Sequence, residues 1–92
     1  MKFNPGLLVI TRGVNDLMAD EQEFAKHVQL SFMRHMAGDW GDVSDEDRVV
    51  NELALQEGDR LFSVYKRDGL AKIWLITEWD RSVTTVLFPD EY

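Results

Sequence analysis

Cysteine is absent from this sequence of 92 residues, so the chain can form no disulfide and can offer no thiolate ligand to a metal. Long hydrophobic runs are absent too, because the apolar stretch Leu7–Ile10 is far too short for a signal-peptide core or a membrane span. From these absences we expect a protein of a reducing compartment, the cytoplasm, with no contact to a membrane.

Basic residues are also scarce, with ten lysines and arginines against 17 aspartates and glutamates. The sequence pI is near 4.6, and the largest basic cluster is the pair Lys66-Arg67. Proteins that hold nucleic acid directly normally contact its phosphates with lysine and arginine, so we expect no sequence-specific binding of nucleic acid.

The negative charge is concentrated in one segment, Asp39–Asp59, which has eight acidic residues and the single base Arg48. The rest of the chain is neutral, with nine acids and nine bases. Such a segment predicts a surface that attracts basic partners over about one Debye length, roughly 8 to 10 Å in physiological salt.

No internal repeat, low-complexity stretch or linker interrupts the chain, so the sequence predicts a single domain over residues 1–92. Half of the β-branched and aromatic residues lie in less than a third of the chain, between Arg60 and Phe88, a stretch that alternates between apolar and polar positions. The pattern predicts a β-meander of three antiparallel strands at Leu61–Lys66, Lys72–Thr77 and Val83–Phe88. Asp68-Gly69 supplies the first turn, and Pro89 ends the last strand.

Lys72–Thr77 is apolar on both faces, with Ile73 and Leu75 on one side and Trp74 and Ile76 on the other. This pattern is typical of a strand covered on both sides, or of a sheet that keeps one face for a partner. The short β-prone run Leu7–Thr11 is a candidate for a fourth, edge strand.

Two main helices are predicted before the meander. Asp20, with Glu23 three residues later, has the spacing of a capping box, and the helix it opens runs to Ala37, where Gly38 can close it. One or two helical turns are also expected over Val14–Ala19. The apolar stripe of the main helix is Phe24, Val28, Ser31 or Phe32, and His35.

Ser44 is the predicted cap of the second helix, which runs over residues 44–57 and ends at Gly58. The helix dipole favours the negative charges of the acidic residues in its first turn. We expect its buried stripe to consist of Val49, Val50, Leu53 and Ala54. The fold class is therefore α+β: two main helices followed by an antiparallel meander of three to four strands.

His35, Asp39 and Asp42 form the first constellation that could carry chemistry, as acid–base groups or as metal ligands. A structural role is favoured, because a single histidine at the edge of an apolar stripe is usually part of the core. No zinc or calcium ligand spacing is present, so no metal and no cofactor are expected. Trp40, between two glycines, is either an exposed anchor for a partner or, more simply, a plug between helix and sheet.

A second constellation combines a turn arginine with carboxylates and hydroxyls, as in small ribonucleases that cut RNA without a metal. The same residues are also ordinary turn and strand residues, and this structural interpretation is favoured. They are Glu78, Asp80, Arg81, Ser82, Thr84 and Thr85.

The sequence resembles a group of small uncharacterised proteins carried by plasmids, integrative elements and phages, known as plasmid-related proteins. The resemblance rests on a set of short runs along most of the chain. They are His35-Met36-Ala37-Gly38-Asp39-Trp40-Gly41-Asp42, Glu46-Asp47-Arg48, Asn51, Gly58-x-Arg60-Leu61, Ser63-x-Tyr65, Lys72-Ile73-Trp74-Leu75-Ile76-Thr77-Glu78, Asp80-Arg81-Ser82-Val83-Thr84-Thr85-Val86-Leu87 and Pro89-x-Glu91-Tyr92. It implies an accessory protein of a mobile element in a bacterial host and carries no catalytic residues. The segment Phe24–Met33 is longer here than in the group.

Two functions therefore compete. In the first, the protein binds a basic surface of a nucleic-acid-handling or defence complex and inhibits it, as anti-CRISPR and anti-restriction proteins do. In the second, it is a small endoribonuclease toxin of barnase- or RelE-like type. The acidic balance favours the first. The predicted partner-binding residues are Asp39, Trp40, Asp42, Asp45, Glu46 and Asp47.

Overall fold

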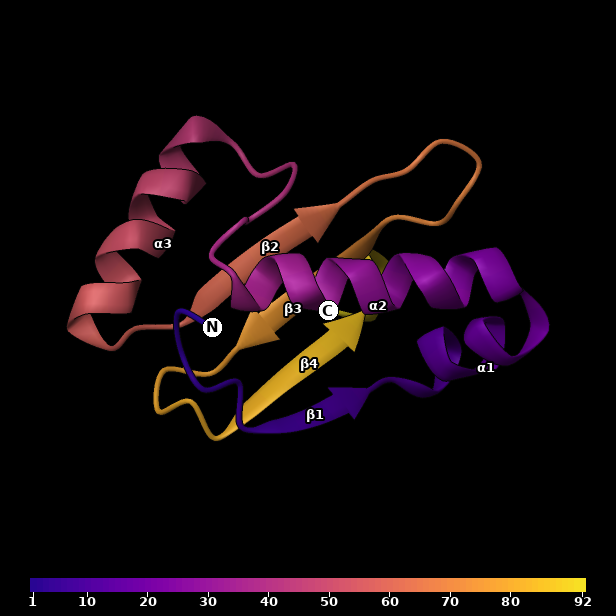
Figure 1. Cartoon of the computed structure of the whole chain (residues 1–92), viewed down its shortest axis with the longest axis horizontal. Coiled ribbons are helices and arrows are strands. Elements are labelled where there is room, and N and C mark those ends of the chain that lie inside the picture. Colours follow the sequence, from indigo (N-terminus) through magenta and orange to yellow (C-terminus); the bar gives the residue numbers. More distant parts are fainter.

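The computed structural model describes all residues from Met1 to Tyr92 and confirms an α+β fold (Figure 1). A four-stranded sheet carries three α-helices and a short C-terminal 3-10 helix. In chain order the elements are β1 (Leu7–Ile10), α1 (Arg12–Asp20), α2 (Gln22–Met36), α3 (Asp45–Glu57), β2 (Leu61–Tyr65), β3 (Ile73–Thr77), β4 (Val83–Leu87) and η1 (Pro89–Glu91).

The predicted meander is present, since β2, β3 and β4 pair in sequence order and antiparallel. The fourth strand also forms, but β1 pairs with β4 in parallel, with Leu8 opposite Thr84 and Ile10 opposite Val86. The sheet order is β1-β4-β3-β2, so β1 and β2 are its two edges. The predicted antiparallel meander of three to four strands is therefore confirmed for three strands, whereas a fourth antiparallel strand is wrong, because β1 is parallel to its neighbour.

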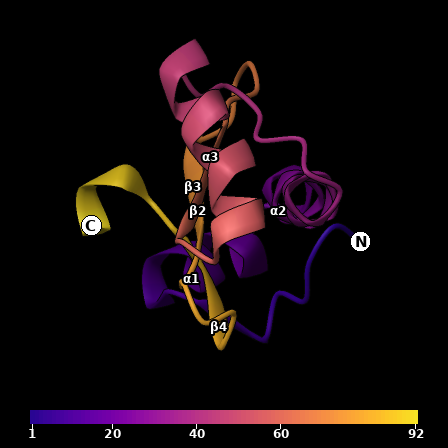
Figure 2. The ribbon, with the colours of Figure 1, turned by 90° about the vertical axis from the view of Figure 1, so that its left-hand side faces the viewer.

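Helix α2 covers one face of the sheet, whereas α1 lies beyond the end of β1 (Figures 1 and 2). Phe24 and Val28 of α2 join the inward residues of the strands and Val14 of α1 in one buried cluster. The strand residues in this cluster are Tyr65, Ile73, Leu75 and Val86. The predicted α2 stripe is thus buried, as amphipathic spacing requires.

The start of α2 differs from the sequence prediction. Asp20 is the last residue of α1, and Glu21 is the N-cap of α2, with no hydrogen bond from its side chain. The predicted capping box at Asp20 and Glu23 is therefore wrong. The reason is that Thr11 is the N-cap of α1, which starts at Arg12 and still includes Asp20. A residue inside α1 cannot be the N-cap of the next helix.

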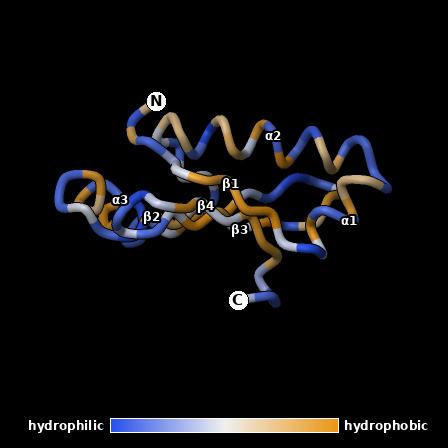
Figure 3. Tube along the Cα trace, turned by 90° about the horizontal axis from the view of Figure 1, so that it is seen from below, coloured by the Kyte–Doolittle hydropathy of each residue, from blue (hydrophilic) through white to orange (hydrophobic).

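The opposite face of the sheet carries no helix, and only the C-terminal segment lies below it in Figure 3. Trp74 and Ile76 of β3 belong to this face, because their neighbours Ile73 and Leu75 point into the core under α2. This face is partly covered by the C-terminal segment, because Tyr92 meets Trp74 with ring centroids 5.8 Å apart and Ile76 is only 5% exposed. That the face is kept for a partner stays a prediction. No helix in the structure is long and apolar enough to cross a membrane.

Candidate functional site

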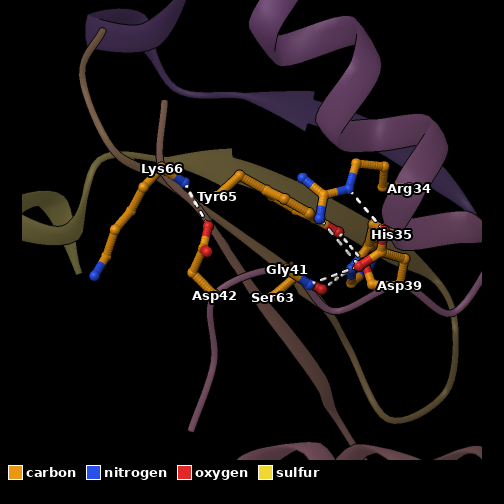
Figure 4. Close-up of polar contacts among 8 residues, drawn as sticks. All are labelled: Arg34, His35, Asp39, Gly41, Asp42, Ser63, Tyr65 and Lys66. Atoms are coloured by element: carbon orange, nitrogen blue, oxygen red, sulfur yellow. Dashed lines mark hydrogen bonds and ion pairs between the residues drawn. The ribbon is translucent and has the colours of Figure 1, made fainter. Parts of the chain in front are cut away.

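The loop between α2 and α3 begins with an ion pair. Arg34 donates to Asp39 through Nε at 2.8 Å and through Nη2 at 3.2 Å, and Asp39 also accepts from the backbone N–H of Gly41 at 3.1 Å (Figure 4). The hydrogen bond from Arg34 is the main reason why the pKa of Asp39 lies below its ordinary value. Asp39 thus orders the loop.

Asp42 also forms hydrogen bonds with the backbone. Its Oδ2 accepts from the N–H of Lys66 at 2.9 Å, and its own N–H donates to the carbonyl of Val64 at 2.7 Å (Figure 4 shows the carboxylate contact). The loop therefore runs along the outer edge of β2 like a fragment of a fifth strand. Gly41 permits this approach, because its φ is 73° and a Cβ would overlap the Val64 carbonyl.

Trp40 is only 1% exposed, so its predicted role as a surface anchor is wrong. The indole packs against Phe3 and His35, and its Nε1–H donates to Glu52 of α3 at 3.2 Å. It belongs to the buried cluster that joins α3 to β2, with Val43, Ala54, Leu61 and Val64. The alternative weighed from the sequence, a plug between helix and sheet, is confirmed. A large aromatic between two glycines is compatible with both positions, so the sequence pattern could not distinguish them.

The remaining predicted residues, Asp45, Glu46 and Asp47, lie together in the first turn of α3, and all three are exposed. Ser44 caps this turn as predicted, because its Oγ accepts from the N–H of Asp47 at 3.1 Å. The carboxylates of Asp45, Glu46 and Asp47 make no ion pair. Of the six predicted residues, these three remain free to meet a partner.

Three apolar side chains are exposed on the outward face of α3, which contradicts the predicted buried stripe. Val49, Val50 and Leu53 are 60%, 58% and 50% exposed, and only Ala54 of that stripe is buried. A shallow hollow on this face is lined by Arg48, Val49, Glu52, Leu53 and Gln56. We call Val49, Val50 and Leu53 the apolar patch of α3; it lies one helical turn after the free carboxylates.

Asn51 explains why α3 presents this face outward. Its Nδ2 donates to the carbonyl of Phe62 at 2.6 Å, and its Oδ1 accepts from the N–H of the same residue at 3.0 Å. The side-chain amide thereby pairs with the edge of β2 as a neighbouring strand would. Because Asn51 is buried against the sheet, Val49, Val50 and Leu53 must point elsewhere. Nothing in the sequence around a helical asparagine indicated this contact.

His35 is fully buried, and both ring nitrogens are bonded: Nδ1 to Ser63 at 2.6 Å and Nε2 to Thr77 at 2.8 Å. The hydrogen bonds continue from Thr77 to Thr84 at 2.7 Å, and Thr84 donates to the carbonyl of Pro5 at 2.7 Å. Because the Thr84 proton goes to Pro5, Thr77 must donate to Thr84 and accept from Nε2–H of His35. In the neutral imidazole, Nδ1 then accepts from the hydroxyl of Ser63.

Burial lowers the pKa of His35 to about 4. The predicted constellation of His35, Asp39 and Asp42 therefore does not form an acid–base site. The imidazole binds hydroxyls of the sheet, whereas the carboxylates bind Arg34 and the backbone of Lys66. No three histidine, aspartate or glutamate side chains lie together in a way that could hold a metal ion.

Arg81 is committed to the backbone as well. Its Nη1 donates to the carbonyl of Asp59 at 2.6 Å, and its Nη2 donates to that of Ala54, in the last turn of α3, at 3.0 Å. Asp80 accepts from the N–H of Ser82 at 3.0 Å, which closes the turn between β3 and β4. This second constellation has the turn and strand geometry of the favoured structural interpretation.

Searches against protein-family models, curated proteins and solved structures find no match to this chain. The candidate site therefore rests on geometry: an exposed apolar patch on α3, preceded by free carboxylates at the start of the same helix.

Proposed function

We propose that this protein acts by binding another protein through the outward face of α3, and that it inhibits a nucleic-acid-handling or defence complex of a bacterial host. It is an accessory protein of a phage or plasmid, of anti-CRISPR or anti-restriction type. The observation that carries the proposal is the exposure of Val49, Val50 and Leu53 beside the free carboxylates of Asp45, Glu46 and Asp47.

This arrangement has the composition of a protein interface. Such interfaces have an apolar centre, which supplies affinity when it is desolvated, and a polar rim. The apolar patch of α3 supplies such a centre, and the acidic first turn supplies part of the rim. Charge at a rim mainly sets the association rate and the choice of partner, so the occupant has a basic surface around an apolar contact.

The ribonuclease alternative has less support. His35 is buried and bonded at both nitrogens, and the guanidinium of Arg81 is bonded to backbone carbonyls. A general base or acid must reach the proton it transfers, and a phosphate needs free donors. We expect purified protein to leave RNA intact in metal-free buffer. RNA cleavage that is lost in both His35→Ala and Arg81→Ala, with the fold retained, would replace the present proposal.

The central experiment measures association with a partner first isolated from a host extract with wild-type protein and then purified. The test variant reverses the acidic turn: Asp45→Lys, Glu46→Lys, Asp47→Lys. The control variant reverses Asp20, Asp68 and Asp90, three exposed acids away from α3 that make no side-chain hydrogen bond, so it makes the same change in net charge.

We expect the test variant to associate at least about tenfold more slowly than the control at low salt, with the difference shrinking as salt is added. Val50→Ser with Leu53→Ser is expected to act on the dissociation rate instead, because it removes apolar contact without changing charge. Equal association rates of the two charge variants at every salt concentration, together with an unchanged dissociation rate of the serine variant, would remove α3 from recognition.

A further inference from the structure

The helix-free face of the sheet has a cavity that α3 binding does not use. Its volume is about 220 Å³, and it lies between β2, β3 and the C-terminus. The residues that line it are Arg60, Phe62, Trp74, Ile76 and Tyr92. A cavity of roughly 150 Å³ holds benzene, so this one has room for an aromatic side chain.

The walls of the cavity are held in place by contacts with each other. Phe62 and Trp74 meet edge to face with ring centroids 5.1 Å apart, and Trp74 meets Tyr92 at 5.8 Å. Arg60 donates from Nη1 to the hydroxyl of Tyr92 at 2.8 Å and lies 5.7 Å from the centre of that ring. Because these side chains are already ordered, they lose little conformational freedom when a ligand occupies the cavity.

Arg60 gives the cavity its selectivity. The ion pairs of the structure involve Arg12, Lys26 and Arg34, so Arg60 has no carboxylate within 4.0 Å. A guanidinium that lacks an anion beside three aromatic rings matches an occupant that combines an aromatic ring with a carboxylate.

The chain itself carries a segment of this chemistry in the turn between β3 and β4. Trp79 is 65% exposed and stands between Glu78 and Asp80. The turn is already ordered, because Arg81 donates to the carbonyls of Glu78 and Trp79 at 3.2 Å each and Asp80 accepts from Ser82. An ordered, exposed tryptophan is the kind of residue that dominates binding energy at interfaces.

We propose that the chain forms a twofold dimer in which Trp79 of each copy enters the Arg60–Tyr92 cavity of the other, with Glu78 or Asp80 meeting Arg60. A twofold interface requires that one chain carry both halves of the contact. Here both halves lie at the same end of the sheet, since Ile76 and Phe62 are paired neighbours and Trp79 follows Ile76 by three residues. The cavity adjoins α3, because Arg60 and Phe62 also line a hollow with Asp47 and Val50. Trp79 and Leu53 line neither of these two hollows, so variants at these positions separate the dimer from the proposed function.

Sedimentation velocity over a wide range of protein concentration tests the dimer. We expect a concentration-dependent monomer–dimer equilibrium for wild type, weakened at least about tenfold by Trp79→Ala and by Arg60→Glu. Trp79→Phe keeps the aromatic ring and should retain most of the association. Leu53→Ser, on the apolar patch of α3, should associate as wild type does. Trp79 and Arg60 are exposed, and circular dichroism of each variant verifies the fold.

A mixing experiment distinguishes this contact from general stickiness. Trp79→Ala retains an intact cavity, and Arg60→Glu retains an intact Trp79, so a mixed dimer of the two restores one of the two contacts. The mixture should therefore associate more strongly than either variant alone. A wild-type monomer at the highest concentration, wild-type association of Trp79→Ala, or a mixture no stronger than its components would each overturn the proposal.

Discussion

Helices α2 and α3 are of similar length, 15 and 13 residues, but they are held against the sheet in different ways. Helix α2 buries five side chains, Phe24, His27, Val28, Ser31 and His35, whereas α3 buries only Asn51 and Ala54. In Figure 1, α2 crosses the sheet, while α3 lies beside the edge strand β2.

The difference shows two ways of attaching a helix. Helix α2 is attached by apolar burial, to which the bonds of His35 add specificity. Helix α3 is attached by two polar contacts, since Asn51 pairs with Phe62 and Arg81 binds the carbonyl of Ala54. It also makes a small apolar contact, in which Ala54 and Leu55 pack in the cluster that contains Trp40, Leu61 and Val64. This attachment leaves the apolar patch of α3 exposed, which is the basis of the proposed binding role.

The largest effect is expected where α2 meets the sheet. Phe24→Ala removes a fully buried ring and leaves a cavity in the main core, so we expect a loss of about 3 to 5 kcal/mol in the free energy of unfolding. Leu53→Ala on α3 is the matched control and should cost about 1 kcal/mol or less. Urea unfolding of both variants measures the difference; equal losses would show that α3 is packed as tightly as α2.

The second prediction concerns the dependence of stability on pH. The pKa of His35 is about 4 in the folded protein, below its unfolded value of 6.5. Its contribution is therefore fully present above pH 6.5 and is lost as the pH falls toward 4, because the unfolded chain then binds a proton that the folded chain excludes. The difference corresponds to roughly 3 kcal/mol.

His35→Gln provides the reference for this measurement. Subtracting its pH profile from that of the wild type removes the contributions of the other groups with lowered pKa values, chiefly His27, Asp39 and Asp80. Urea unfolding between pH 7 and pH 4.5 should show a steeper loss in the wild type. Parallel profiles would mean that the imidazole is not held neutral by the sheet.

A smaller but still clear effect is expected at the attachment of α3. Asn51→Leu leaves both the N–H and the carbonyl of Phe62 without partners, and we expect a loss of about 2 kcal/mol. Asn15→Leu, at an exposed position of α1, is the control and should be nearly neutral. Hydrogen exchange adds a second readout, since the amide of Phe62 should lose protection in Asn51→Leu; unchanged protection would contradict the pairing.

The smallest effect is expected on the apolar patch of α3. Val50→Ser with Leu53→Ser should change the free energy of unfolding by only about 0.5 kcal/mol per site, because both side chains are largely solvated in the free protein. Thermal unfolding measures this directly. A loss as large as that of Phe24→Ala would mean that the patch is covered, and the comparison of the two helices would fail.

Much of the secondary structure could be predicted from short-range patterns. Ser44 starts α3 and Gly58 ends it in the left-handed conformation, as their residue types indicated. The three strands of the meander follow from alternation and turn residues. The start of α2 could not be placed correctly, because two adjacent helices compete for the same acidic residues around Asp20.

The sequence by itself determined the order of the helices and strands, the acidic character of residues 39–59 and the amphipathic face of α2. These features depend on backbone conformation and hydrogen bonds within a few residues. Only the tertiary structure decided that Trp40 is buried, that β1 runs parallel to β4 and that α3 turns its apolar patch outward. The physical reason is that each depends on contacts between distant residues, such as that of Asn51 with Phe62, which no local pattern encodes.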